Sequence, residues 1–176
     1  MTQRDVFSAP EAVTVVGRHL WVANAQGSPL TEFNTSNGSL ARVVHGKGDG
    51  YYMIGTLASN ESDLWGAPIG NVVTQTSTSN GSLIRAVRTI ATGVSGVSAI
   101  ATSNGELWVA NICANSDTEI NERNGSRVRV NSASRDGLNS PSGIGLTSDR
   151  VWVVNSGNTT VTELDSINGS LVRVIQ

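Results

Sequence analysis

Short hydrophobic segments alternate with polar turns along the whole chain. Near the C-terminus, four segments rich in β-branched and aromatic residues are each bounded by Gly, Asn or Ser. This pattern predicts strands over 142–147, 150–155, 160–165 and 170–175. No segment combines a 3.6-residue hydrophobic period with capping residues, so we predict an all-β chain without helices.

Two sequence markers repeat with the same period. Successive tryptophans lie 44, 43 and 44 residues apart, and successive Asn-Gly-Ser triplets 43, 44 and 44 apart. The markers are Trp21, Trp65, Trp108 and Trp152, with Gly38, Gly81, Gly125 and Gly169. A four-stranded unit of this length is typical of a β-propeller blade. We predict a single propeller domain over 1–176, with blades at about 9–45, 50–90, 94–131 and 139–176.

The last hairpin of each blade allows two registers around its Asn-Gly turn. A two-residue loop places the repeat arginines opposite Phe33, Thr76, Ile120 and Leu164. A three-residue loop with a left-handed Gly and a bulge instead pairs Arg42, Arg85, Arg129 and Arg173 with Glu32, Gln75, Glu119 and Glu163. Opposite charges across strands contribute roughly 0.2–1 kcal/mol. We therefore predict the bulged turn, which also pairs Phe33 with Ala41 and Leu164 with Val172.

The blade pattern resembles known propeller repeats. The segments 107–111 (Leu-Trp-Val-Ala-Asn) and 151–155 (Val-Trp-Val-Val-Asn), each followed by Thr-Glu-aliphatic and Asn-Gly-Ser, resemble bacterial YVTN-type and NHL-type repeats and the blades of streptogramin lyases. The resemblance implies the fold and leaves the function open, because such blades occur in enzymes, sensors and scaffolds. Blade two departs from the pattern where Pro68 replaces Asn, which predicts a strand end there.

Four blades are the lower limit for a closed propeller. An open chain would expose one apolar sheet face at each end, so we predict a C2 homodimer that closes an eight-blade ring. A compact four-blade monomer, a higher ring and a piece of a longer chain are the alternatives. The segment 3–7 is a weak candidate for an extra closing strand.

Composition and charge exclude several classes of protein. Charged residues make up 15% of the chain and the net charge is −2, so we expect neither nucleic acid nor a membrane as a partner. One Cys excludes an internal disulfide framework. Met1–Val15 has no basic and apolar signal sequence, which predicts a cytoplasmic location, or an extracellular one if the N-terminus is truncated.

No motif in the sequence predicts a catalytic site. The Gly-rich loop around Lys47 lacks the phosphate-loop spacing. His19 is expected on a strand face and His45 at the surface, and neither has an evident catalytic partner. Cys113 is expected in a loop. We therefore predict no catalytic residues, no metal ligands and no cofactor.

Asn24, Asn111 and Asn155 follow their tryptophans at equivalent positions and have two interpretations. As amides at one end of the propeller axis they could bind a polar ligand or a divalent cation, as the ligands of propeller lactonases do. As strand-ending residues they would hydrogen-bond the backbone. The structural interpretation is favoured because Pro68 replaces the amide in one blade.

The sequence therefore predicts a non-enzymatic scaffold or binding module, a self-assembling propeller fragment that holds a protein, peptide or sugar. The alternative is a metal-assisted lyase or lactonase with its site on the propeller axis. The resemblance to streptogramin lyases implies a His and acidic metal ligands for that alternative, and no residue here matches those positions.

Overall fold

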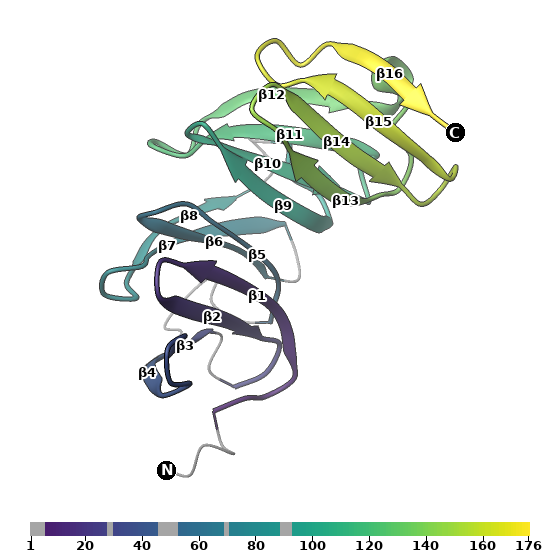
Figure 1. The fold of residues 1–176 in the computed structure, drawn as a ribbon. Helices are drawn as coiled ribbons and strands as arrows, with labels where there is room; N and C mark the ends of the chain where they lie inside the picture. The colour runs from purple at the N-terminus through teal and green to yellow at the C-terminus, as the bar shows by residue number, and fades with distance from the viewer. Residues whose placement is uncertain (1–5, 28–29, 46–52, 69–70, 89–92) are drawn as a thin grey trace. The chain divides into compact units, whose positions relative to one another are not determined.

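A computed structural model describes residues 6–27, 30–45, 53–68, 71–88 and 93–176. These residues form four antiparallel sheets, each with four strands in chain order (Figure 1). The predicted all-β architecture of four-stranded blades is confirmed. The chain divides into two compact units, Met1–Ala86 and Val87–Gln176.

The first unit contains blades one and two. Blade one consists of β1 (Pro10–Val16), β2 (His19–Asn24), β3 (Leu30–Asn34) and β4 (Leu40–Val44). Blade two consists of β5 (Ile54–Ser59), β6 (Asp63–Pro68), β7 (Val72–Ser77) and β8 (Leu83–Arg88). Pro68 is the last residue of β6, as its missing N–H predicts. Lys47 and residues 1–5 lie outside the described residues.

The second unit contains blades three and four. Blade three consists of β9 (Val97–Ser103), β10 (Glu106–Asn111), β11 (Ser116–Asn121) and β12 (Arg127–Ser132). Blade four consists of β13 (Pro141–Leu146), β14 (Arg150–Asn155), β15 (Thr160–Asp165) and β16 (Leu171–Ile175). The strands of blade four agree with the sequence prediction to within one residue at each end.

The prediction of a helix-free chain is wrong at one place. The connection between blades three and four forms a single helical turn, α1 (Ala133–Asp136). A buried carboxylate holds this turn, because Asp136 Oδ2 accepts a hydrogen bond from the backbone N–H of Ser132 at 3.0 Å. One turn has too few residues to show a helical period, so sequence periodicity could not reveal it.

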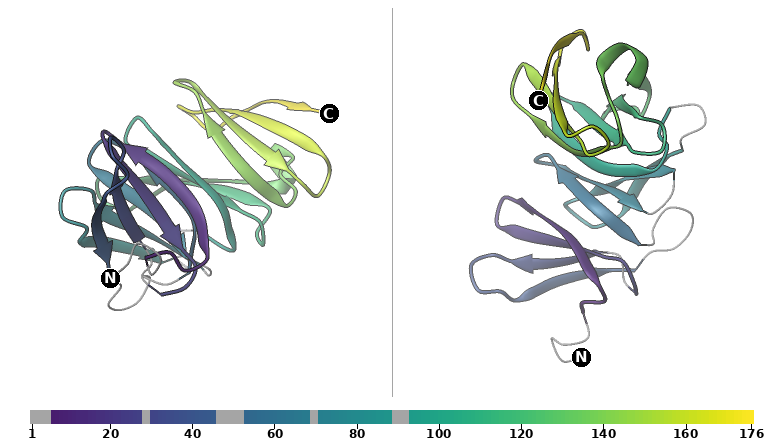
Figure 2. Two further views of the ribbon diagram at one scale, coloured as in Figure 1. Left: turned by 60° about the horizontal axis from the view of Figure 1, so that its bottom comes forward. Right: turned by 90° about the vertical axis from the view of Figure 1, so that its right-hand side faces the viewer.

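The two blades of each unit lie next to each other (Figure 2), and each unit has a hydrophobic core between them. In the first unit Trp21 and Leu30 of blade one pack with Ile54 and Leu64 of blade two. In the second unit Trp108 of blade three packs with apolar residues of blade four and with Leu138. Trp21 and Trp108 therefore join the two blades of their units.

The predicted charge pairing across the last hairpin is confirmed in three blades. Arg42 pairs with Glu32, Arg129 with Glu119 and Arg173 with Glu163. The pairing of Arg85 with Gln75 stays a prediction, since Gln75 Nε2 donates to Asp63 Oδ2 at 2.9 Å and Arg85 has other interactions.

The left-handed glycine of the predicted turn is confirmed, but the predicted loop length and the position of the bulge are wrong. In blade one the loop has four residues, because the N–H of Asn34 donates to Ser39 and the N–H of Gly38 donates to Asn34. The bulge lies in β4, so Phe33 pairs with Leu40 and not with Ala41. The same shift pairs Leu164 with Leu171 and not with Val172. A longer loop and a bulge inside the strand give the same Glu–Arg register as a shorter loop.

Replacing Gly81 with alanine is expected to destabilise the chain more than replacing Gly105. Both glycines have positive φ angles, +74° and +81°, so each substitution costs about 1 kcal/mol in the backbone. A Cβ at Gly81 would lie 2.9 Å from Val44 Cγ2, whereas a Cβ at Gly105 meets nothing within 4 Å. Urea titration should therefore show a loss of about 2–3 kcal/mol for Gly81→Ala. Equal losses for the two variants would contradict this packing.

Candidate functional site

In blades one and three the tryptophan, the glutamate and the arginine of the repeat form a cluster where the two blades of a unit meet. In blade one Arg42 Nε lies 3.2 Å from Glu32 Oε2, and the guanidinium lies 5.8 Å from the centre of the Trp21 ring. Arg42 Nη2 also donates to the carbonyl oxygen of Ser79 at 3.0 Å. Since Ser79 directly precedes the Asn-Gly-Ser triplet of blade two, the arginine links its own blade to the next one.

The second unit repeats this link. Arg129 Nε contacts Glu119, and Arg129 Nη2 donates to the carbonyl oxygen of Ile167 at 2.7 Å. Ile167 precedes the Asn-Gly-Ser turn of blade four, as Ser79 precedes that of blade two. The repeated residues thus form an ionic and hydrogen-bonded clasp between the two blades of each unit.

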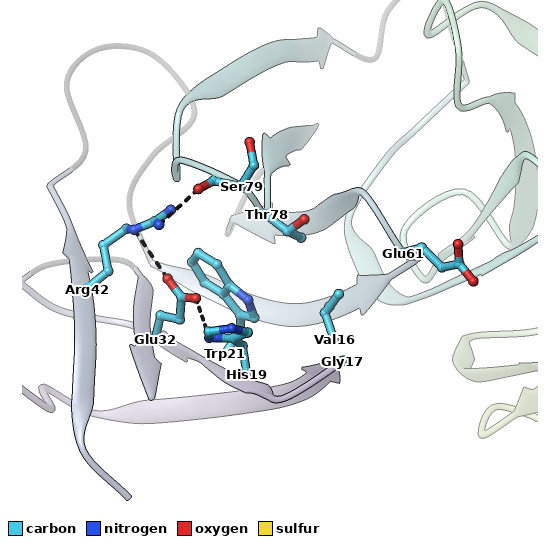
Figure 3. Close-up of a pocket in the computed structure, with 9 residues that line it drawn as sticks. All are labelled: Val16, Gly17, His19, Trp21, Glu32, Arg42, Glu61, Thr78 and Ser79. Carbon is cyan, nitrogen blue, oxygen red and sulfur yellow. Dashed lines mark hydrogen bonds and ion pairs between the residues drawn. The ribbon is translucent and has the colours of Figure 1, made fainter. Parts of the chain in front are cut away.

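A cavity of about 600 Å³ opens beside the clasp of the first unit (Figure 3). Its walls include His19, Trp21 and Glu61. His19 Nδ1 lies 2.8 Å from Glu32 Oε1, so Glu32 contacts both the imidazole and Arg42. These groups offer donors and acceptors to a polar ligand. The lining residues contain no nucleophile paired with a positioned base.

A cavity of about 300 Å³ occupies the equivalent place in the second unit, beside Trp108 and Arg129. Here Glu106 stands where His19 stands in blade one, two residues before the tryptophan. Asp63 and Arg150 occupy the same position in the other blades. The residue two positions before the tryptophan therefore differs in charge from blade to blade.

Sequence reasoning missed the pair of His19 and Glu32. The signal was present, because the position two before each tryptophan is always titratable: His19, Asp63, Glu106 and Arg150. His19 pairs with Asn34 and Trp21 with Glu32, which makes His19 and Glu32 diagonal neighbours on one face. The expected surface position of His45 and the expected loop position of Cys113 agree with the structure.

The amides of Asn24, Asn111 and Asn155 lie inside the blades, at most 1% exposed. Their Oδ1 atoms accept the backbone N–H of Ser8, Ser95 and Asn139 at 3.2, 3.0 and 3.1 Å. Each amide therefore fixes the segment that leads into its blade. Asn111 Nδ2 also donates to Ser116 and Thr118 within blade three. Ligand binding by these amides stays a prediction.

The four repeat tryptophans do not share one environment. Trp21, Trp65 and Trp108 are buried. Trp152 of blade four is half-buried, although Arg173 lies 5.8 Å from its ring centre as Arg42 does from Trp21. Glycines 38, 81, 125 and 169 of the repeat all adopt the left-handed conformation, with φ between +67° and +74°.

Two carboxyl groups of blade three titrate far from their ordinary range. Burial raises the pKa of Asp117 to about 7, although Asn131 donates to it, and the carboxylates of Asp136 and Glu119 add to the shift. Burial also raises the pKa of Glu119 to about 7, which Arg129 opposes and Glu106 reinforces. These groups lie between the blades of one unit, where they affect stability directly.

The described residues contain no group of three or more His, Cys, Asp or Glu side chains arranged to hold a metal ion. No helix in the described part of the chain is long and apolar enough to cross a membrane. The metal-assisted alternative and the absence of a cofactor both stay predictions.

No family model matches the chain, and the curated proteins contain no significant match to it. Solved structures do match. Hydrazine synthase of Kuenenia stuttgartiensis has a TM-score of 0.80 at 15% identity, covering 99% of this chain and 52% of that one. The Swd1 β-propeller domain of Myceliophteria thermophila has a TM-score of 0.76 at 14% identity, covering 95% and 55%. The WD40 repeats of RRP9 have a TM-score of 0.77 at 12% identity, covering 94% and 50%.

The chain spans about half the length of each of these three structures. At such low identities the similarity concerns the fold alone. The four four-stranded sheets and these neighbours together establish that the chain has a β-propeller fold of four blades.

Proposed function

We propose that the chain is a non-enzymatic scaffold, a half-propeller that is completed by a second copy of itself in an eight-blade ring. The supporting observation is an unburied apolar face at each end of the series of blades. In blade one Val13 is 62% exposed, and in blade four Val154 is 46% exposed beside the half-buried Trp152. Exposed faces of this kind are typical of interaction surfaces.

Two further observations support this proposal. Two of the neighbours, the Swd1 propeller domain and the WD40 repeats of RRP9, are about twice as long as this chain. Residues at the blade junctions, such as His19 and Glu106, vary in charge beside a Trp–Glu–Arg cluster that blades one, three and four share. A protein, a peptide or a sugar bound on this variable surface is the ligand class that we propose. The Trp-Val-Ala-Asn and Asn-Gly-Ser segments further support our assignment of the blades to the YVTN and NHL type.

Light scattering on the purified chain tests the assembly. A closed ring of two copies has twice the mass of a single chain of 18.4 kDa, and we expect that doubled mass. A mass of 18.4 kDa at micromolar concentration would identify a four-blade monomer and overturn the proposal. A mass greater than twice that of the single chain would indicate a ring of more than two copies and would also overturn the two-copy assembly.

A further inference from the structure

The junction of blades three and four shows how one blade of this protein covers the next. Trp108 projects from blade three and packs with Val151, Val153 and Leu164 of blade four. Leu138, three residues before β13, completes the cluster and is 1% exposed. A tryptophan of one blade therefore covers an apolar face and the residue that leads into the next blade.

Blade one carries the same face without a tryptophan on it. Leu20, Val22 and Phe33 occupy the strand positions of Val151, Val153 and Leu164, and they cluster with Val6. Phe7 precedes β1 by three residues, as Leu138 precedes β13, and its ring lies 5.2 Å from that of Phe33. Phe7 is 44% exposed, in contrast to Leu138.

The entry segments confirm the equivalence of Phe7 and Leu138. The residue after each one donates its backbone N–H to the asparagine of its blade, Ser8 to Asn24 at 3.2 Å and Asn139 to Asn155 at 3.1 Å. The apolar face of blade one therefore has the same arrangement as the face of blade four that Trp108 covers.

Blade four carries the residues that would complement this face: a tryptophan, a glutamate and an arginine at the positions of the clasp. Glu163 Oε2 contacts Arg173 Nε at 2.5 Å, and Arg173 lies over Trp152. The side chains of Arg42 and Arg129, which also reach the next turn, are 31% and 22% exposed, whereas that of Arg173 is 61% exposed. Blade four thus has the tryptophan, glutamate and arginine of the clasp, but its arginine has no turn of a following blade to contact within the described part of the chain.

The turn of blade one is the matching part. Ser36 precedes its Asn-Gly pair as Ser79 and Ile167 precede theirs. A Cβ at Gly81 or Gly169 would lie within 3.0 Å of an arginine side chain, whereas one at Gly38 meets nothing within 4 Å. The space that an arginine fills at the internal junctions is open at blade one.

We propose that blade four of one copy docks on blade one of a second copy in the register of the junction between blades three and four. Trp152 covers Phe7, Leu20 and Phe33 of the second copy. Arg173 donates to the carbonyl oxygen of Ser36 of the second copy. This inference rests on the proposed assembly and specifies its contacts, so it predicts which residues face each other.

The contact between blades one and two provides a reference for that register. Thr14 Oγ1 and Ser59 Oγ lie 2.7 Å apart. Thr14 pairs with Trp21 across its sheet, and Ser59 pairs with Leu64, the residue before Trp65. In blade four the residue that corresponds to Thr14 is Gly145, which pairs with Trp152. In blade one the residue that corresponds to Ser59 is Val15, which pairs with Leu20.

Cysteines at these two positions test the register. A Cβ at Gly145 meets nothing within 4 Å, and Val15 is exposed, so both sites accept the change. With Cys113→Ser as background, equal amounts of Val15→Cys and Gly145→Cys chains are mixed and oxidised. We expect a disulfide-linked dimer of the two different chains on non-reducing gels, forming at least about tenfold faster than with the control pair.

The control pair is Val13→Cys with Gly145→Cys. Val13 lies on the same face as Val15 but two residues away, which displaces it by about 7 Å. That distance prevents a disulfide in the proposed register. A double Thr14→Cys, Ser59→Cys chain serves as a positive control, because its disulfide forms within one chain.

The outcomes separate this inference from the proposed function. Equal rates for the two pairs, or disulfides only between two Val15→Cys chains, would overturn the register while a doubled mass still supports the assembly. A mass of 18.4 kDa for the unmodified chain would overturn both. Rapid linkage of Val15→Cys to Gly145→Cys with a doubled mass would support both.

Discussion

Replacing Trp108 with alanine is expected to lower the free energy of unfolding by about 3–5 kcal/mol. The indole is 2% exposed and fills the space between blades three and four beside Leu138 and Leu164. Its removal loses a large buried apolar surface and leaves a cavity that two stiff sheets cannot close. Far-ultraviolet circular dichroism during urea titration measures the loss without depending on the fluorescence of the removed residue.

Ile167→Ala is the matched control for this variant. Ile167 is 78% exposed, and its contact with Arg129 uses the backbone carbonyl, which alanine retains. Its substitution should change the free energy of unfolding by less than about 0.5 kcal/mol. A loss below about 1 kcal/mol for Trp108→Ala would show that the two blades do not share a core.

Asp117→Asn is expected to stabilise the chain increasingly as the pH rises. The pKa of the Asp117 carboxyl rises from 3.8 when unfolded to about 7 when folded, because burial disfavours the charge. Between these two values the folded state binds a proton that the unfolded state has lost, so stability falls as the pH rises. Above about pH 7 the Asp117 carboxyl is ionised in both the folded and the unfolded chain, and the free energy of unfolding falls no further from this group.

Asparagine abolishes this titration and keeps an oxygen that accepts from Asn131, as Asp117 does at 2.8 Å. The free energy of unfolding of the variant minus that of the unmodified chain should therefore increase by about 3 kcal/mol between pH 5 and pH 8. Urea titrations at both pH values measure this change. A difference that does not vary with pH would show that Asp117 titrates near its ordinary range in the folded chain.

Glu119 is a second buried carboxyl that contributes to the pH dependence of stability. Its pKa is also raised to about 7, so part of the pH dependence should persist in the Asp117→Asn chain. Glu119 faces Arg129, whereas the Oδ2 atom of Asp117 has no hydrogen-bond partner among the described residues. We therefore choose Asp117 for substitution, because replacing Glu119 would also break the clasp.

The sequence was most informative about relations within a blade. Because side chains alternate between the faces of a strand with a period of two, the turn fixes which residues stand opposite each other. Glu32 and Arg42 were paired correctly for this reason. The same reasoning missed the bulge at Ala41. A three-residue loop, and a four-residue loop with a bulge in the strand, both place Glu32 opposite Arg42, so the charge pairing does not distinguish them.

The sequence was least informative about hydrogen bonds and ion pairs other than the Glu–Arg pairs, and about burial. Asn111 and Asn155 follow their tryptophans in an obvious pattern, yet their hydrogen bonds to Ser95 and Asn139 link segments sixteen residues apart. The pairing of His19 with Glu32 depends on which diagonal neighbours point into the same cavity. The positions involved recur in each repeat, but strand periodicity does not specify their hydrogen-bond partners.

The sequence by itself determined the number of blades, their strands and the Glu–Arg register, because these follow from a period of about 44 residues and from strand alternation. Only the tertiary structure decided that Trp108 is covered by the next blade while Trp152 stays half-buried. Equivalent residues in a repeat have the same local structure, but their burial depends on whether another blade packs against them.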